Sequence, residues 1–156
     1  MEMPGRSAVR PSWTSWSPGS VPRHKGQVVV SFTEFNAEHY RTLPGIFRAG
    51  FRLRQGWYAM DGAVGLLLWG QTLQARGGSL SVWTDEDSLQ RFVRLPRHLE
   101  IVRKFHRRVR VRSVTWTQDW TGPSDLKSFV SPLFNISINS PLTVDTSTVL
   151  SKIPKA

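Results

Sequence analysis

The chain has 156 residues, of which 39% are hydrophobic, and this is enough to build one compact domain with tails. It contains no cysteine, which excludes disulfide bonds, thiolate metal sites and a cysteine nucleophile. The net charge is +10, no apolar run is long enough to span a bilayer, and none follows Arg6 and Arg10 as in a secretory signal, so we expect a cytoplasmic protein without a membrane span.

The composition divides the chain into three zones. Residues 1–26 are rich in Pro, Gly, Ser and Arg, which predicts a flexible N-terminal arm, although its two tryptophans are unusual for a solvated tail. Residues 27–120 carry the periodic patterns of a compact domain. Residues 121–156 are poor in charge, and apolar residues alternate with small polar ones over 129–138. This predicts an extended C-terminal segment that is partly docked, across a dimer or on its own domain.

The first predicted elements of the middle zone are a strand and a helix. Residues 27–35 are rich in valine and phenylalanine without a breaker, which predicts a strand. Residues 37–55 follow helical spacing, with Pro44 dividing them into two turns of different axis and Gly56 ending the helix.

Two further strands are predicted next. Residues 57–69 read as a strand that is interrupted at Asp61-Gly62, a turn or bulge signal, with Val64, Leu66 and Leu68 on one face. Residues 80–83 alternate between apolar and polar side chains after a loop, which is typical of a strand.

A capped helix and a last strand complete the pattern. The Thr84 hydroxyl and the acidic side chain of Asp87 are placed to cap a helix start, and Pro96 begins a second helical segment. The buried stripe of these two segments is predicted to contain Leu89, Phe92, Val93, Leu99, Val102 and Phe105. Residues 109–116 then alternate as a strand.

The order strand, helix, strand, strand, helix, strand predicts an α+β, ferredoxin-like βαββαβ fold, with an antiparallel sheet and two helices on one face. The other face needs a cover, because large apolar side chains are unfavourable in water over such an area. The side chains expected there are Trp57, Leu66, Leu68, Trp83 and Trp116. We therefore predict a homodimer in which two sheets pack face to face.

Three sequence segments carry a resemblance to a known superfamily. Residues 78–93 hold a strand ending in Ser-x-Trp and a capped helix with Leu-x-x-Phe, residues 96–98 are Pro-Arg-His, and residues 112–116 form a closing strand. This pattern resembles the dimeric α/β-barrel superfamily, nearest to the antibiotic-biosynthesis monooxygenase type and its spheroidene-monooxygenase-like relatives. The resemblance covers about residues 27–120 and is specific for the fold, since members include cofactor-free oxygenases, haem-using enzymes and isomerases.

The resemblance implies a ligand pocket between the sheet and the two helices, with His98 as the catalytic residue. Trp83, Phe32, Phe47 and Trp116 are the substrate-binding residues it implies. Each has a structural alternative: His98 could pack and donate one hydrogen bond to a backbone carbonyl, and Trp83 could be a core residue.

Haem is the alternative cofactor reading, because haem-degrading relatives use an Asn, a Trp and a His around the porphyrin. Asn36, Trp83 and His98 have these types, but Asn36 reads more simply as a helix cap. No cofactor is therefore expected. The sequence shows no Ser–His–Asp set, phosphate loop or metal-ligand spacing.

Two acidic residues and one basic stretch remain to be assigned. Glu34 or Asp61 could act as a general base beside an apolar cavity, although the turn explains Asp61 better. Residues 91–112 contain nine Arg or Lys and one acid, usually a solvated face, and without a nucleic-acid motif nucleic acid is not expected as a partner.

Together these features predict a small-molecule enzyme of the monooxygenase-like class that oxygenates or otherwise modifies an aromatic or polyketide-type metabolite. The alternative is a non-catalytic dimeric module whose basic face binds an anionic partner, or a haem-binding relative. An enclosed apolar pocket on the order of several hundred Å³ favours the enzyme, and a sheet face filled by side chains favours the module.

Overall fold

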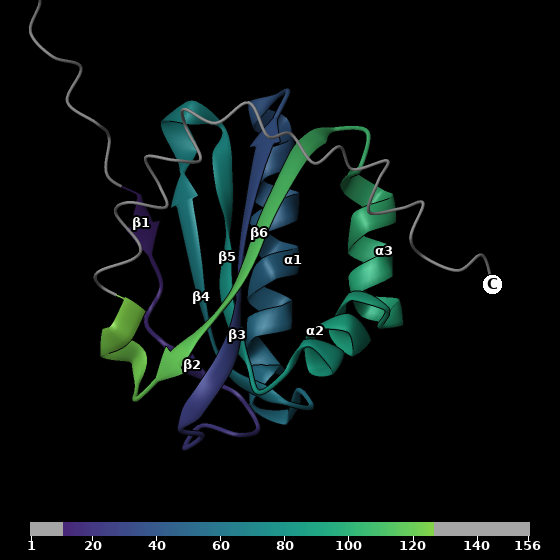
Figure 1. Cartoon of the computed structure of the whole chain (residues 1–156). Coiled ribbons are helices and arrows are strands. Elements are labelled where there is room, and N and C mark those ends of the chain that lie inside the picture. Colours follow the sequence, from purple (N-terminus) through teal and green to yellow (C-terminus); the bar gives the residue numbers. More distant parts are fainter. Residues whose placement is uncertain (1–10, 127–156) are drawn as a thin grey trace, which may run out of the picture.

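The computed structural model describes residues 11–126. These residues form one antiparallel sheet and three α-helices (Figure 1). In chain order the elements are β1 Ser12–Trp13, β2 Ser17–Pro18, β3 Gly26–Ala37, α1 Leu43–Gln55, β4 Ala63–Gln71, β5 Arg76–Trp83, α2 Glu86–Val93, α3 Pro96–Phe105 and β6 Val109–Trp120. The strand order is β1-β4-β5-β3-β6, and β2 also pairs with β4.

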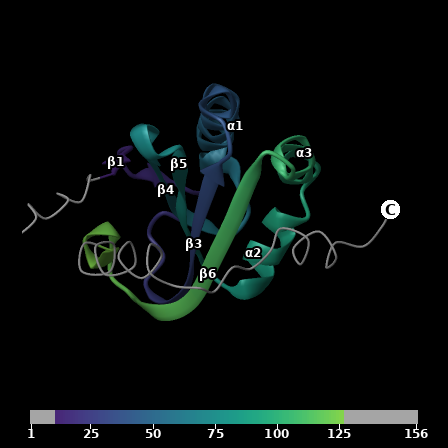
Figure 2. The same cartoon turned by 90° about the horizontal axis from the view of Figure 1, so that it is seen from above.

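The four long strands and the helices confirm the predicted α+β, ferredoxin-like fold. Each of the two crossovers, α1 after β3 and α2–α3 after β5, returns the chain to the same sheet. Figure 2 shows α1 and α3 on the same side of the sheet, and Leu43 of α1 and Phe105 of α3 pack in one buried cluster. No helix within residues 11–126 is long and apolar enough to cross a membrane.

Local signals set the helix boundaries, although α1 begins at Leu43 and not at residue 37, which is the last residue of β3. Pro44 lies in the first turn of α1 rather than in its interior, where a missing N–H costs nothing, and Gly56 closes the helix by donating to the carbonyls of Leu53 and Arg54. Pro96 begins α3 as expected.

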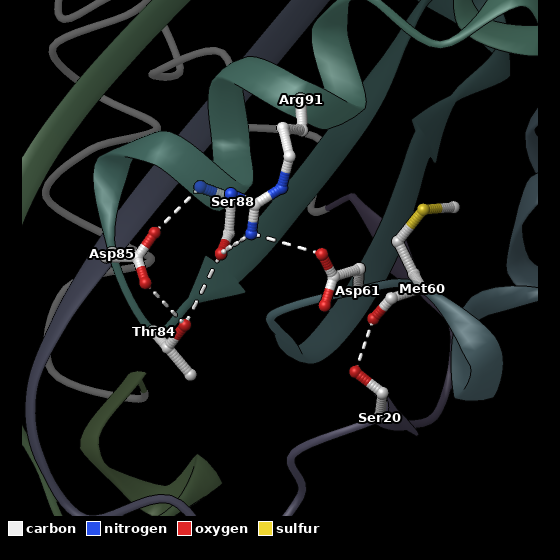
Figure 3. Close-up of polar contacts among 7 residues, drawn as sticks. All are labelled: Ser20, Met60, Asp61, Thr84, Asp85, Ser88 and Arg91. Carbon is white, nitrogen blue, oxygen red and sulfur yellow. Dashed lines mark hydrogen bonds and ion pairs between the residues drawn. The ribbon is translucent and has the colours of Figure 1, made fainter.

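The cap of α2 lies one residue later than predicted. Asp85, not Thr84, is the N-cap: its backbone is extended, and its carboxylate accepts a 2.7 Å hydrogen bond from the backbone N–H of Ser88 (Figure 3). A carboxylate at this position stabilises the helix start through both the hydrogen bond and the helix dipole. Thr84 instead donates to Asp85.

The two faces of the sheet differ from the prediction in β4. A bulge between Ala63 and Gly65 breaks the alternation, so Val64 lies on the face opposite to Leu66. Leu66, Leu68, Trp57 and Trp83 therefore pack on the helix side, in a cluster with residues of α2. Four of the five side chains predicted for the uncovered face are thus under the helices.

The face away from the helices has its own buried core. Its fully buried members come from all four long strands and from residue 126: Val28, Val30, Phe32, Val64, Trp69, Leu80, Val82, Trp120 and Leu126. Trp13, Trp16, Leu67 and Trp116 pack against them. Most of this face is covered by side chains of the same chain, although Val114 of β6, opposite Phe32, is exposed. The sheet-to-sheet dimer stays a prediction.

The described part of the predicted flexible arm is paired to the sheet. Ser12 and Trp13 pair with Gly70 and Trp69, and residues 17–18 pair with 65–66. At the other end, Pro123–Leu126 forms a short 3-10 turn whose Leu126 is buried. The C-terminal stretch predicted to dock, 129–138, lies outside the described residues.

Candidate functional site

A cavity of about 760 Å³ lies between the helix side of the sheet and the three helices. Its floor comes from β3, β4, β5 and β6, and its walls come from the helices and from residues 12–14. A space of this size holds a drug-sized molecule, as small-molecule sites in proteins do.

Hydroxyl groups line the floor of the cavity. They belong to Ser31 and Thr33 on β3, Ser79 and Ser81 on β5, and Ser113 and Thr115 on β6. The strand registers arrange them in two rows that run across the sheet, Ser81–Ser31–Thr115 and Ser79–Thr33–Ser113. We call these six residues the hydroxyl floor.

The hydroxyl floor can both donate and accept hydrogen bonds. Thr33 Oγ1 and Ser113 Oγ lie 3.0 Å apart, so part of the floor is already connected. Neighbouring strands are about 4.8 Å apart, so successive hydroxyls in a row can reach separate oxygen atoms of one ligand. Ser113 and Thr115 are exposed, which places the open side of the cavity along β6.

Sequence reasoning missed the hydroxyl floor, although a signal was present. The three strands carry Ser-x-Thr at residues 31–33, Ser-x-Ser at residues 79–81 and Ser-x-Thr at residues 113–115. In each motif the two hydroxyl residues are alternate positions, which share one face of a strand. Small hydroxyl residues at matching places in three neighbouring strands leave room above a sheet and keep it polar. The pattern becomes visible only when the strand registers are known.

The walls of the cavity are mainly aromatic and aliphatic. They include Phe47 and Phe51 of α1, Trp57 before β4, Phe92 of α2 and Phe105 of α3. Phe47 therefore lies in the cavity, as expected for the substrate-binding residue that the resemblance implied. Flat apolar walls over a polar floor suit a planar ligand with polar edges.

Trp83 lies behind this wall and does not line the cavity. Its ring is fully buried and makes contacts of 5.2 Å between ring centroids with both Trp57 and Phe92. Its Nε1 donates a 2.9 Å hydrogen bond to the Oγ of Ser81, which does line the cavity. Trp83 is therefore a core residue, which is the structural alternative given above. The Phe92 ring lies against both Trp83 and His98 and separates them.

His98 lies in the first turn of α3 and lines the cavity. Its Nδ1 is 3.0 Å from the carbonyl oxygen of Val93, and its ring centroid is 4.7 Å from that of Phe92. A carbonyl only accepts, so Nδ1 carries the proton, and in the neutral ring Nε2 keeps its lone pair. Burial lowers the pKa of His98 below 6.5, although the Val93 carbonyl acts in the opposite direction.

The charge of the cavity lining is one-sided. Within residues 11–126 its ionisable side chains are Arg94, His98 and His106, and none is Asp or Glu. Glu34 is buried on the opposite sheet face and paired with Arg76, and Asp61 is exposed and paired with Arg91 at 3.1 Å. Neither carboxylate can therefore serve as the general base in this cavity.

Two of the substrate-binding residues implied by the resemblance are on the wrong face of the sheet. Phe32 stacks on Trp69 with a centroid distance of 5.7 Å, and Trp116 donates from Nε1 to Gln118 at 2.7 Å. Both pack in the core away from the helices. Residues of a strand alternate between faces, and these two occupy the positions between those of the hydroxyl floor.

The three residue types expected around a haem are not brought together. Asn36 donates from Nδ2 to Glu34 at 3.3 Å, on the sheet face opposite to the cavity, and is not a helix cap. Trp83 lies behind the wall, so only His98 faces the cavity. The chain does not fit the haem reading, and no cluster of three or more His, Asp or Glu side chains that could hold a metal occurs within residues 11–126.

Comparison with known proteins supports the fold. No family model and no curated protein sequence matches the chain. A "putative monooxygenase" from Lactobacillus acidophilus is 9% identical with a TM-score of 0.50, over 65% of this chain and 46% of that longer one. A conserved protein of unknown function from Bacteroides thetaiotaomicron is 8% identical with a TM-score of 0.50, over 61% and 100%. SnoaB, a cofactor-independent oxygenase from Streptomyces nogalater, is 18% identical with a TM-score of 0.47, over 63% and 98%.

These similarities lie at the level of the fold. The chain shares the ferredoxin-like fold of these proteins, and this is the fold that the sequence resemblance implied.

Proposed function

We propose that the chain is a small-molecule enzyme of the monooxygenase-like class that binds a planar, oxygen-bearing aromatic ligand between the sheet and the helices. The observation that carries this proposal is the composition of the cavity lining, in which a polar hydroxyl floor faces apolar walls and the half-buried His98 is the base. The cavity volume of about 760 Å³ also favours an enzyme over a module with a filled sheet face.

In this proposal His98 starts the reaction. A ligand CH₂ carbon that lies between two aromatic rings joined by a carbonyl loses a proton to Nε2 of His98, which is neutral because burial lowers its pKa. The absence of a carboxylate from the described lining favours the resulting ligand anion. The Val93 carbonyl holds the ring by Nδ1 throughout.

Dioxygen is the oxidant that the proposal requires. One of its oxygen atoms becomes a carbonyl on the reacting CH₂ carbon, and the other leaves as water with the two hydrogens of that carbon. The protein supplies the base, the apolar walls and the orientation of the ligand. The fold of a "putative monooxygenase" at a TM-score of 0.50 is consistent with this reaction type.

Oxygen uptake with an anthrone as probe tests the proposal. The wild-type chain should consume one dioxygen per quinone formed, and His98→Gln should abolish this activity while circular dichroism stays unchanged. His39→Gln is the matched control, because His39 is exposed and does not line the cavity. Equal rates in wild type and His98→Gln would remove His98 from the mechanism, and no binding of any polycyclic aromatic would overturn the ligand class.

A further inference from the structure

The N-terminal residues 11–25 lie on the sheet in the place where a second subunit is expected. We infer that this segment, here called the arm, replaces that subunit: it closes the β4 edge and covers part of the far face of the sheet within one chain. The intact chain is then a monomer at this face, and the arm closes its side of the cavity without a partner. This inference does not depend on the reaction proposed above.

The arm first closes the edge strand β4. Four hydrogen bonds of 2.9–3.0 Å join the two segments: Thr14 N to Leu68 O, Leu68 N to Thr14 Oγ1, Gly19 N to Val64 O, and Val21 N to Ala63 O. An edge strand with free N–H and C=O groups is a template for another chain. The arm occupies these groups in β4.

The arm also covers the face of the sheet with its two tryptophans. Trp13 lies against Trp69 with 6.2 Å between ring centroids, and Trp16 stacks on Trp120 at 5.7 Å. The strand residues of this core include Val30, Leu80 and Val82, all 0% exposed. An apolar area of this kind would otherwise be the interface of a symmetric dimer.

Two glycines make the fit of the arm specific. A Cβ on Gly65 would lie 1.9 Å from the Trp16 ring, and a Cβ on Gly19 would lie 2.1 Å from the carbonyl oxygen of Ala63. No real Cβ tolerates such distances, so the arm and β4 approach each other closely only because both positions lack a side chain. The close contact therefore requires a glycine in each of the two segments.

The arm is connected to the cavity as well. Ser12, Trp13 and Thr14 belong to the cavity lining, and Arg54 of α1 donates to Ser15 Oγ at 2.9 Å. A partner subunit is thus not needed to close this side of the cavity.

The other end of the arm is tied to the turn that supports α2. Ser20 donates to the carbonyl oxygen of Met60, and the neighbouring Asp61 pairs with Arg91 of α2 (Figure 3). The arm therefore contacts elements on both sides of the cavity, and its loss should weaken ligand binding in addition to exposing the sheet face.

The first test compares the full chain before and after removal of the arm. A specific protease site replaces residues 22–25, of which Pro22, Arg23 and Lys25 are exposed, and the folded protein is cleaved afterwards. Light scattering at micromolar concentration should give a monomer for the intact chain. The fraction that has lost the arm, identified by mass spectrometry, should self-associate, and an added peptide of residues 11–21 should reverse this while a scrambled peptide should not.

A dimeric intact chain, or an arm-free fraction that stays monomeric, would overturn the inference. A second variant guards against poor cleavage: Trp16→Ser should increase hydrogen exchange of the β4 amides and promote self-association at high concentration. Tyr58→Ser is the matched control, because Tyr58 is an exposed aromatic residue outside the arm. Equal exchange and equal mass in these two variants would also contradict the role of the arm.

Discussion

The indole Nε1 of Trp83 donates a 2.9 Å hydrogen bond to the Oγ of Ser81 two positions earlier on β5. Both side chains point to the helix side of the sheet, since residues i and i+2 of a strand share a face. Trp83 lies in the core beneath Phe92, whereas Ser81 belongs to the hydroxyl floor. One hydrogen bond thus joins the aromatic core to the polar surface of the cavity.

Replacing Ser81 by Ala should destabilise the protein by about 1–3 kcal/mol, because the fully buried Nε1 of Trp83 loses its acceptor. Trp83→Ala should cost about 3–5 kcal/mol, since it removes a core ring and leaves a cavity. Urea unfolding of both variants measures these losses. In a double-mutant cycle, Ser81→Ala should cost less in the Trp83→Phe background. An unchanged cost would show that the hydrogen bond contributes nothing.

The sequence predicted the elements of the fold well because their signals are local. Pro44, Gly56 and Pro96 act on the backbone where they stand, so the helix limits follow from them. The assignment of sheet faces failed because the Asp61-Gly62 signal does not say where the alternation of β4 changes, and the bulge lies between Ala63 and Gly65. The cover of the far face was also hidden, since the contact of Trp16 with Gly65 joins residues 49 positions apart.

The stability of the protein should fall as the pH is lowered through 6.5, because of His98. Burial lowers the pKa of His98 in the folded state below 6.5, so the unfolded chain binds the proton at higher pH. The stability that depends on the neutral ring is complete above pH 6.5 and is lost as the pH falls towards the folded pKa.

Urea unfolding of wild type and His98→Gln between pH 8 and pH 5 checks this sign. The difference in unfolding free energy between the two proteins should shrink as the pH falls, because the Gln side chain does not titrate. His39→Gln should keep the slope of the wild type. A parallel pH dependence for wild type and His98→Gln would mean that another group causes the loss.

Gly62 is the second site where a small change should be costly. Its φ is +69°, and a Cβ there would lie 2.0 Å from Ser88 Oγ at the start of α2. Its carbonyl also accepts a 3.0 Å hydrogen bond from Thr84 N. Gly62→Ala should therefore destabilise the protein by more than the roughly 1 kcal/mol of the backbone strain alone.

The double variant Gly62→Ala with Ser88→Gly separates the two causes. It should recover the part due to the clash and keep the part due to the positive φ, when thermal unfolding is compared with Ser88→Gly alone. Gly122→Ala is the matched control, since a Cβ at Gly122 would have no atom within 4 Å. Equal costs at Gly62 and Gly122 would contradict the packing of α2 on this turn.

The candidate site was only partly visible in the sequence. His98 and Phe47 line the cavity. They could be predicted because helical spacing points to Phe47 and the resemblance points to His98. Phe32 and Trp116 were expected to face the cavity, but they lie on the opposite face of the sheet. The hydroxyl floor depends on the register of three strands, which length and composition do not fix.

Thr33→Val should weaken ligand binding without a large loss of stability. Valine has nearly the shape of threonine, so the change removes one hydroxyl of the floor and its 3.0 Å contact with Ser113 and keeps the packing. A net hydrogen bond contributes about 0.5–1.5 kcal/mol, so the dissociation constant should rise roughly 2- to 12-fold. Quenching of tryptophan fluorescence by a dihydroxyanthraquinone, a non-reacting probe, measures this constant.

Thr117→Val is the matched control on the same face of β6, outside the cavity lining, and should bind as the wild type does. If both valine variants bind the probe equally well, the hydroxyl floor does not recognise the oxygen atoms of the ligand.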